Sequence, residues 1–160
     1  MDEKILDIVL QRSLTLHQAY KHLRILKEYL TYQIFGAQQA TLEKEDQAFI
    51  DQIDKDLLQQ FTKDNLASEF EKILSQLEKI PVLVVYFGFQ PDNELIKSIS
   101  DWIKNNYSER IILDSKIDNN LIAGCSLVWK GIYKDYSLKA KIEDHRQEIL
   151  TYLSQTLHRT

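Results

Sequence analysis

Cysteine, glycine and proline are scarce in this chain of 160 residues, and each scarcity excludes a class of protein. Cys125 is the single cysteine, so neither an intramolecular disulfide nor a zinc site of several cysteines can form, as expected in a reducing cytoplasm. With four glycines, neither a Walker loop nor a dinucleotide-binding fingerprint can be written. Two prolines and a hydrophobic share of 44% exclude a collagen-like or disordered chain.

A dominant charge and a long apolar run are also missing. Twenty Lys and Arg against 24 Asp and Glu give a net charge of −4, so no global positive field indicates nucleic acid. The longest uncharged apolar stretch, residues 80–89, is half of the ~20 residues that a membrane span requires. The start, Met1-Asp2-Glu3-Lys4, has neither a basic nor an apolar signal region. We expect a globular protein that meets membranes only through its partners.

Residues 1–80 predict a helical bundle, because their apolar residues recur at helical spacing. Thr15 and Gln18 have the form of a capping box that begins a long helix, and Gly36 is a natural end for it. Four helices are expected, beginning near Ile5, at Thr15, at Thr41 with a buried face that reaches Phe61, and near Asp64. Pro81 ends the helical pattern.

Residues 81–160 predict a small sheet covered by helices. Strands are expected over 81–87, 110–114 and 121–129, with a tight turn at Lys130-Gly131 into a short strand at 132–133, and helices over 93–105 and 138–157. The order β-α-β-β-α, after a helical first half, gives an α+β fold of two domains, 1–80 and 81–160.

The residues that carry chemistry in other proteins form no convincing site here. His17 and His22 are five apart, which is wrong for a helical metal-binding pair, and solvated helix histidines are the simpler interpretation. Cys125 and His145 can meet only through the fold, and a thiol in an apolar strand is usually inert. The tyrosines and lysines over 130–141 are diluted by acidic residues, which argues against a nucleic-acid face. We therefore expect no enzyme activity, metal or cofactor.

The segment from Lys116 to Leu138 resembles the C-terminal signature of the delta subunit of F-type ATP synthases, the oligomycin-sensitivity-conferring protein of mitochondria. The family carries Asp, two residues, Leu-Ile/Val-Gly-Gly, a strand and a turn, and then Asp-Gly-Ser before a helix. Ala123 and Tyr136 replace two of its glycines. The matching positions are Asp118, Leu121, Ile122, Gly124, Gly131, Asp135, Ser137 and Leu138, with Ile142 where the family has leucine.

These motif residues also have a purely structural interpretation. A glycine that enters a strand lets another backbone approach closely, and Asp-x-Ser before a helix supplies caps for its free N–H groups. Asp135 or Ser137 is then expected to bind the first turn of the last helix. A tyrosine at position 136 is expected to be strained if its φ is positive.

The resemblance implies a mechanical function. It implies that the helical half holds the N-terminal helices of the alpha subunits and that the C-terminal half grips the b subunits. Such a stator lets ion-driven rotation make ATP, at the cytoplasmic face of a bacterial membrane and without nucleic acid. The residues expected to bind partners are Tyr20, Tyr29 and Tyr32 for alpha, and Leu150 and Leu153 for b.

Two alternatives stay open. A generic adaptor that binds an unrelated partner helix makes the same demands on the first half and leaves the signature as coincidence. A small α/β enzyme or nucleic-acid module built on the second half requires a polar pocket, and the charge balance opposes it. A neighbouring gene for an ATP synthase alpha or b subunit favours the stator over both.

Overall fold

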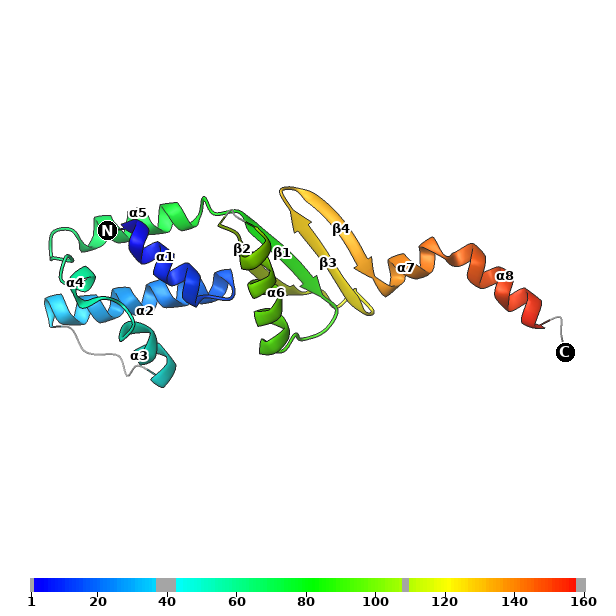
Figure 1. Cartoon of the computed structure of the whole chain (residues 1–160), viewed down its shortest axis with the longest axis horizontal. Helices are drawn as coiled ribbons and strands as arrows, with labels where there is room; N and C mark the ends of the chain where they lie inside the picture. The colour runs from blue at the N-terminus through cyan, green and yellow to red at the C-terminus, as the bar shows by residue number, and fades with distance from the viewer. Residues whose placement is uncertain (1, 37–42, 108–109, 158–160) are drawn as a thin grey trace.

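The computed structural model describes residues 2–36, 43–107 and 110–157. Its first half consists of helices α1 (Asp2–Arg12), α2 (Leu16–Phe35), α3 (Lys44–Ile50), α4 (Lys55–Leu58) and α5 (Leu66–Leu77). Its second half contains β1 (Val82–Phe87), α6 (Asn93–Asn106), β2 (Ile112–Ile117), β3 (Gly124–Trp129), β4 (Ile132–Ser137), α7 (Leu138–Asp144) and α8 (Arg146–Leu157). The bundle lies at one end of an elongated molecule, the sheet in the middle and α8 at the other end (Figure 1). The predicted α+β fold is confirmed.

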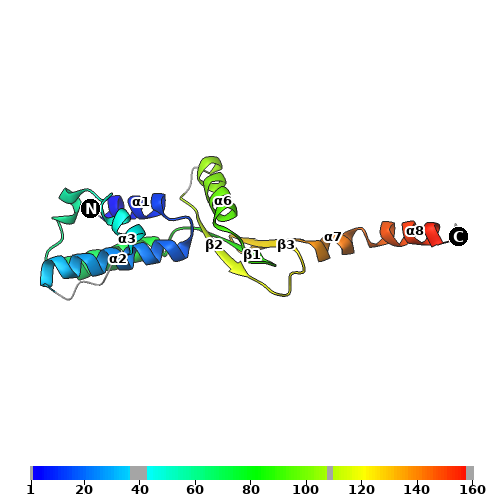
Figure 2. The ribbon, with the colours of Figure 1, turned by 90° about the horizontal axis from the view of Figure 1, so that it is seen from below.

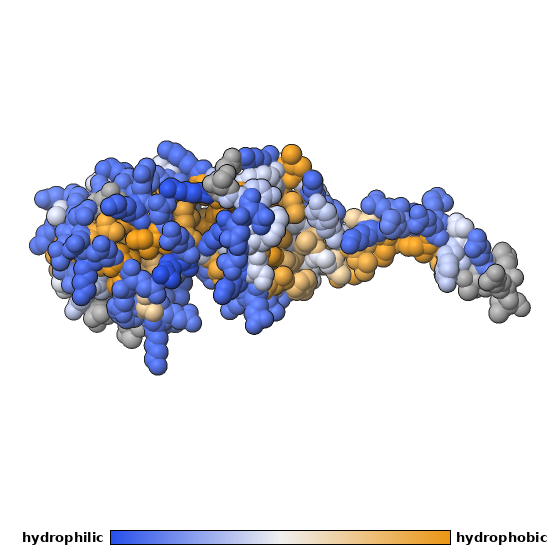
Figure 3. Space-filling view, in the orientation of Figure 1, coloured by the Kyte–Doolittle hydropathy of each residue, from blue (hydrophilic) through white to orange (hydrophobic). Residues whose placement is uncertain are grey.

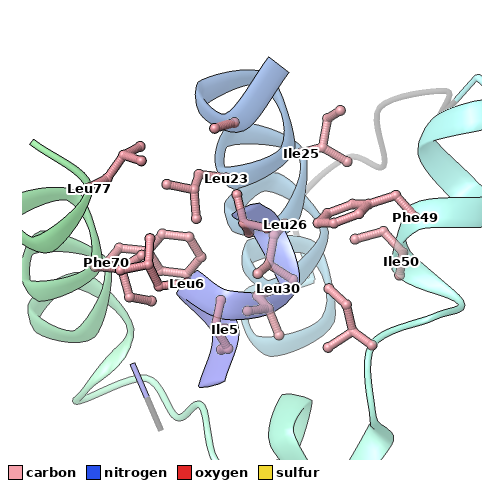
Figure 4. Close-up of a cluster of buried hydrophobic side chains, with 14 of the residues drawn as sticks. Ile5, Leu6, Leu23, Ile25, Leu26, Leu30, Phe49, Ile50, Phe70 and Leu77 are labelled. Atoms are coloured by element: carbon pink, nitrogen blue, oxygen red, sulfur yellow. The ribbon is translucent and has the colours of Figure 1, made fainter. Parts of the chain in front are cut away.

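The bundle packs around α2, whose apolar face meets α1, α3 and α5 in one buried cluster (Figure 4). Thr15 caps α2 as predicted, because its hydroxyl accepts the backbone N–H of Gln18 at 3.3 Å. The Gln18 side chain completes the cap one residue earlier than expected, by accepting the N–H of Leu14 at 2.8 Å. The helix ends at Gly36, also as predicted.

The expected third helix is instead two short ones. Helix α3 ends at Ile50, and the carboxylate of Asp54 accepts the N–H of Asp56 at 3.0 Å, which starts α4. The predicted buried face survives the break, since its members Phe49, Ile50, Ile53, Leu57 and Phe61 are all buried. Thr41 and Leu42, where the predicted helix and its buried face begin, lie outside the described residues. The fourth helix has Asn65 as its cap, next to the predicted start near Asp64.

The second half holds a mixed four-stranded sheet in the order β2-β1-β3-β4. Strand β1 pairs parallel with β2 and antiparallel with β3, and β3 pairs antiparallel with β4. The short strand predicted at 132–133 extends to Ser137, and the predicted last helix is divided at His145. The sequence missed both because the strand is polar and the helical spacing continues through the break.

Helix α6 covers one face of β1 and β2, and its apolar residues form a second cluster with those strands (Figure 2). Helices α7 and α8 leave the edge strand β4 and extend away from the sheet in both ribbon views. Within the described ranges, none of the helices combines the length and the apolar character needed to cross a membrane.

Candidate partner-binding site

The signature opens with a turn that Asp118 organises. Its carboxylate accepts the backbone N–H and the side-chain amide of Asn120, both at 2.9 Å, and its own N–H donates to the carbonyl of Phe87 at 2.9 Å. These bonds bring the backbone of Leu121 against Gly88, where a side chain would strike the Leu121 carbonyl. The neighbouring Ile122 is 75% exposed, so it contributes surface and no core.

Gly124 is the place where two backbones meet. Its φ is +89°, and a Cβ added there would lie 2.6 Å from the carbonyl oxygen of Tyr136 on β4. The close approach expected from the sequence is therefore present. At the other end of the hairpin, Lys130 and Gly131 have φ of +48° and +78°, the left-handed pair of a type I′ turn.

The Asp135–Ser137 segment caps helix α7. The Ser137 hydroxyl accepts the N–H of Ala140 at 3.2 Å, as predicted for a residue before a helix. Asp135 acts one step earlier than expected, because its carboxylate accepts the N–H of Ser137 at 2.8 Å. Hydrogen bonds from Ser137 hold the pKa of Asp135 below its usual value. Tyr136 lies in β4 without a positive φ, so it replaces the family's glycine without the strain considered above.

Helices α7 and α8 present apolar side chains to solvent. Figure 3 shows a continuous hydrophobic strip along one side of this segment and a hydrophilic strip on the other. The predicted partner residues Leu150 and Leu153 are 52% and 50% exposed, and none of residues 146–155 is buried. Leu138 and Ile142 are exposed on α7 as well. Such a strip of large apolar residues marks an interaction site more often than a free surface.

The three tyrosines predicted to bind a partner are spread along α2. Tyr20 is 40% exposed, Tyr29 is half-buried against the bundle core, and Tyr32 is half-buried. The three tyrosines therefore differ in how much surface each exposes to a partner. Tyr20 has the most free surface, while Tyr29 also serves the core.

The sequence interpretation of His22 as a solvated helix residue is wrong. Its ring stacks on Phe49 with centroids 4.2 Å apart, and its Nδ1 lies 2.9 Å from the Ser13 hydroxyl. That hydroxyl donates to the carbonyl of Val9 at 2.7 Å, so Nδ1 carries the hydrogen that binds Ser13. Burial, with the nearby Lys21 charge, lowers the pKa of His22 below its usual value.

This environment predicts a pH dependence of stability. Because the folded pKa of His22 lies below the unfolded one, the unfolded chain binds the proton more tightly. The free energy of unfolding is then level above pH ~6.5 and falls as the pH drops from there toward the folded pKa. Urea midpoints from pH 8 to 5 measure it. His22→Asn, which keeps an N–H for Ser13, should flatten the slope, and the exposed His17→Asn should leave it unchanged; equal slopes in both variants contradict the assignment.

A joint between the two halves was not predicted at all. The Lys104 ammonium on α6 donates to the carbonyls of Ser13 at 3.1 Å and Gln11 at 3.4 Å, and burial lowers its pKa. Arg110 pairs with Asp7 of α1 at 2.8 Å. The α1–α2 loop also pairs with the sheet, through a parallel bridge between Thr15 and Leu113. Lys104 and Ser13 are 91 residues apart in sequence, so no local sequence pattern predicts their contact.

Within the described ranges, no group of three His, Cys, Asp or Glu side chains is placed to hold a metal ion. Cys125 is half-buried in β3, and His145 is exposed between α7 and α8. The hollow beside α6, about 360 Å³ in volume, is lined mainly by aromatic and aliphatic residues of α6, β3 and β4. Among the lining residues that the structure describes, Lys134 alone carries a charge.

The described structure is thus a helical bundle joined to a small sheet, with helices α7 and α8 that offer apolar side chains to solvent. The family model described as "ATP synthase delta (OSCP) subunit" matches residues 6–149, nearly the whole chain, and the chain belongs to this family. A search of curated proteins found no match. Membership implies a structural subunit in the peripheral stalk of ATP synthase, part of a membrane-bound complex.

Proposed function

We propose that this chain joins the catalytic head of ATP synthase to the b-subunit stalk, so that the head does not turn with the rotor and ion flow is coupled to ATP synthesis. The bundle binds the N-terminal helices of the alpha subunits, and the C-terminal half binds b. The observation that carries the proposal is the exposed apolar strip of α7 and α8, at the end of the molecule away from the bundle.

The b site is a helix-on-helix contact. Helix α8 has twelve residues, and an isolated helix of that length is marginal in water. None of residues 146–155 is buried, so the helix lacks core contacts that could stabilise it. A partner helix laid along the strip, over Leu150 and Leu153, supplies those contacts.

The alpha site lies on the bundle. Tyr20 offers a partly exposed aromatic ring beside the ion pair of Lys21 and Asp46, whose nitrogen and oxygen are 3.0 Å apart. Burial of such a ring by a docked helix is a typical source of affinity. Tyr29 and Tyr32 lie further along the same helix. Tyr29 is about 180° around it from Tyr20, so these two tyrosines are proposed contacts on different sides of α2.

Co-purification tests the proposal directly. The full chain, tagged in its native cell, is recovered under gentle conditions and its partners are identified by mass spectrometry. Recovery of alpha, beta and b with membranes supports a stator at the cytoplasmic face of the bacterial membrane. Recovery of the intact chain without them overturns the proposal in favour of an unrelated adaptor.

The double variant Leu150→Asp/Leu153→Asp is expected to lose b while keeping alpha. Two carboxylates in an apolar helix contact must be desolvated without partners, so b should fall at least about tenfold in the purified material. Thr151→Asp/Ser154→Asp adds the same charge on another part of the exposed α8 and is the matched control. Circular dichroism verifies folding. Unchanged b recovery in the leucine variant would rule out this part of α8 as the b site.

A further inference from the structure

The residues along the apolar strip of α7 and α8 follow a regular spacing, beyond the general amphipathic character of these helices. Residues at spacings of four and three recur along it: Leu138, Ile142, His145, Ile149 and Tyr152. This is the a and d pattern of a coiled-coil seam, and we call these five residues the seam. All five are exposed.

The seam continues through the break between the helices. The N–H of His145 donates to the carbonyl of Lys141 at 3.2 Å, and the N–H of Ile149 donates to the carbonyl of His145 at 3.0 Å. The first of these bonds ends α7 and the second begins α8, and the hydrophobic strip continues across the break between them (Figure 3). At about 1.5 Å per residue, the segment 138–157 offers a contact about 30 Å long.

The charges beside the seam are mostly of one sign. In a coiled coil the e and g positions flank the apolar seam and choose the partner. Here they include Lys139, Lys141 and Arg146 against the single carboxylate of Glu148. Lys139 also stabilises the charge of Asp135 near the end of β4, which leaves Lys141 and Arg146 as the main flanking charges.

These charges disfavour a second copy of the chain. In a parallel pair of seams, Lys141 of one copy faces Arg146 of the other. In the fully overlapped antiparallel register, Arg146 faces Arg146 and Glu148 faces Glu148. Both arrangements place like charges together, which costs free energy and selects against self-pairing.

We propose that the seam binds a partner helix with heptad spacing whose flanking positions are predominantly acidic. The inference rests on the proposed function, because it describes the partner of the same two helices, α7 and α8. It also separates the two leucines considered above. Leu153 borders the seam, whereas Leu150 lies about 100° around the helix from Ile149, at the outer edge of the contact.

Synthetic helices provide the probe. One labelled peptide of four heptads carries Ile at a, Leu at d and Glu at e and g, and its counterpart carries Lys at e and g. The full chain should bind the acidic peptide at least about tenfold more tightly, and the preference should shrink as salt rises from about 0.05 to 0.5 M. Lys141→Glu/Arg146→Glu should reverse the preference.

Position-matched variants test the seam itself. Ile149→Asp should abolish binding of the acidic peptide, while Thr151→Asp, two residues away and outside the seam, should change it less than about threefold. Equal binding of both peptides, equal effects of the two variants, or a stable homodimer in sedimentation that Ile149→Asp disrupts would each overturn the inference. Loss of the proposed function is a different result, because there the unmodified chain recovers no b subunit from cells.

Discussion

Gly124→Ala is expected to lower the free energy of unfolding by about 2–4 kcal/mol. The new Cβ would sit 2.6 Å from the Tyr136 carbonyl oxygen, and the φ of +89° is a conformation that alanine avoids. The clash involves backbone on both sides, so it cannot be relieved by turning a side chain. For a chain of this length the loss corresponds to about 5–15 °C in the thermal midpoint, which scanning calorimetry measures.

Gly131→Ala separates the two causes. Its φ of +78° is similar, yet nothing lies within 4 Å of the position that a Cβ would take. The control therefore reports the backbone strain alone, on the order of 1 kcal/mol. If both alanine variants lose the same stability, the close approach of the β3 and β4 backbones contributes nothing, and the structural interpretation of Gly124 is wrong.

Ile112→Ala is expected to separate the unfolding of the two halves. Strand β2 places Ile112, 4% exposed, in the bundle cluster and its neighbour Leu113, 1% exposed, in the α6 cluster. Truncation of a buried isoleucine costs about 2–4 kcal/mol, and here the cavity lies between the halves. Tryptophan fluorescence reports only the second half, through Trp102 and Trp129, while far-ultraviolet circular dichroism also reports the bundle helices.

The two signals should unfold together in the unmodified chain and at different urea concentrations in the Ile112→Ala variant. Ile73→Ala is the matched control, because Ile73 is fully buried on α5 inside the bundle, whereas Ile112 is supplied to the same cluster by the sheet. It should lower both transitions together. Coincident transitions in the Ile112→Ala variant would contradict the prediction. They would mean that the contacts of Lys104, Arg110 and Thr15 are enough to couple the two halves when the Ile112 side chain is truncated.

The parts of this fold that follow from sequence are those set by neighbours along the chain. The cap at Thr15, the turn at Lys130-Gly131 and the cap at Ser137 each depend on residues within a few positions. Asp54 shows the limit of such reasoning. It starts a new helix while the apolar spacing continues, so a pattern of buried residues alone predicts one helix where there are two.

The parts that the sequence did not yield depend on contacts across the chain. Lys104 contacts Ser13, and Arg110 contacts Asp7, across the boundary between the sheet half and the bundle. His22 needed Phe49 of another helix to become half-buried. The spacing of the five seam residues can be read from the sequence, but only the structure shows that their side chains are exposed.

The strand order sets how this molecule responds to being pulled. Residues 78–81 join the bundle directly to β1, and helix α7 leaves from β4 at the edge of the sheet. Tension between the two ends therefore crosses the β1–β3 and β3–β4 ladders in series. The β1–β2 and β3–β4 ladders have six residue pairs each, and the central β1–β3 ladder has four, from Val84 with Val128 to Phe87 with Cys125. The middle of the sheet is thus the link that yields first.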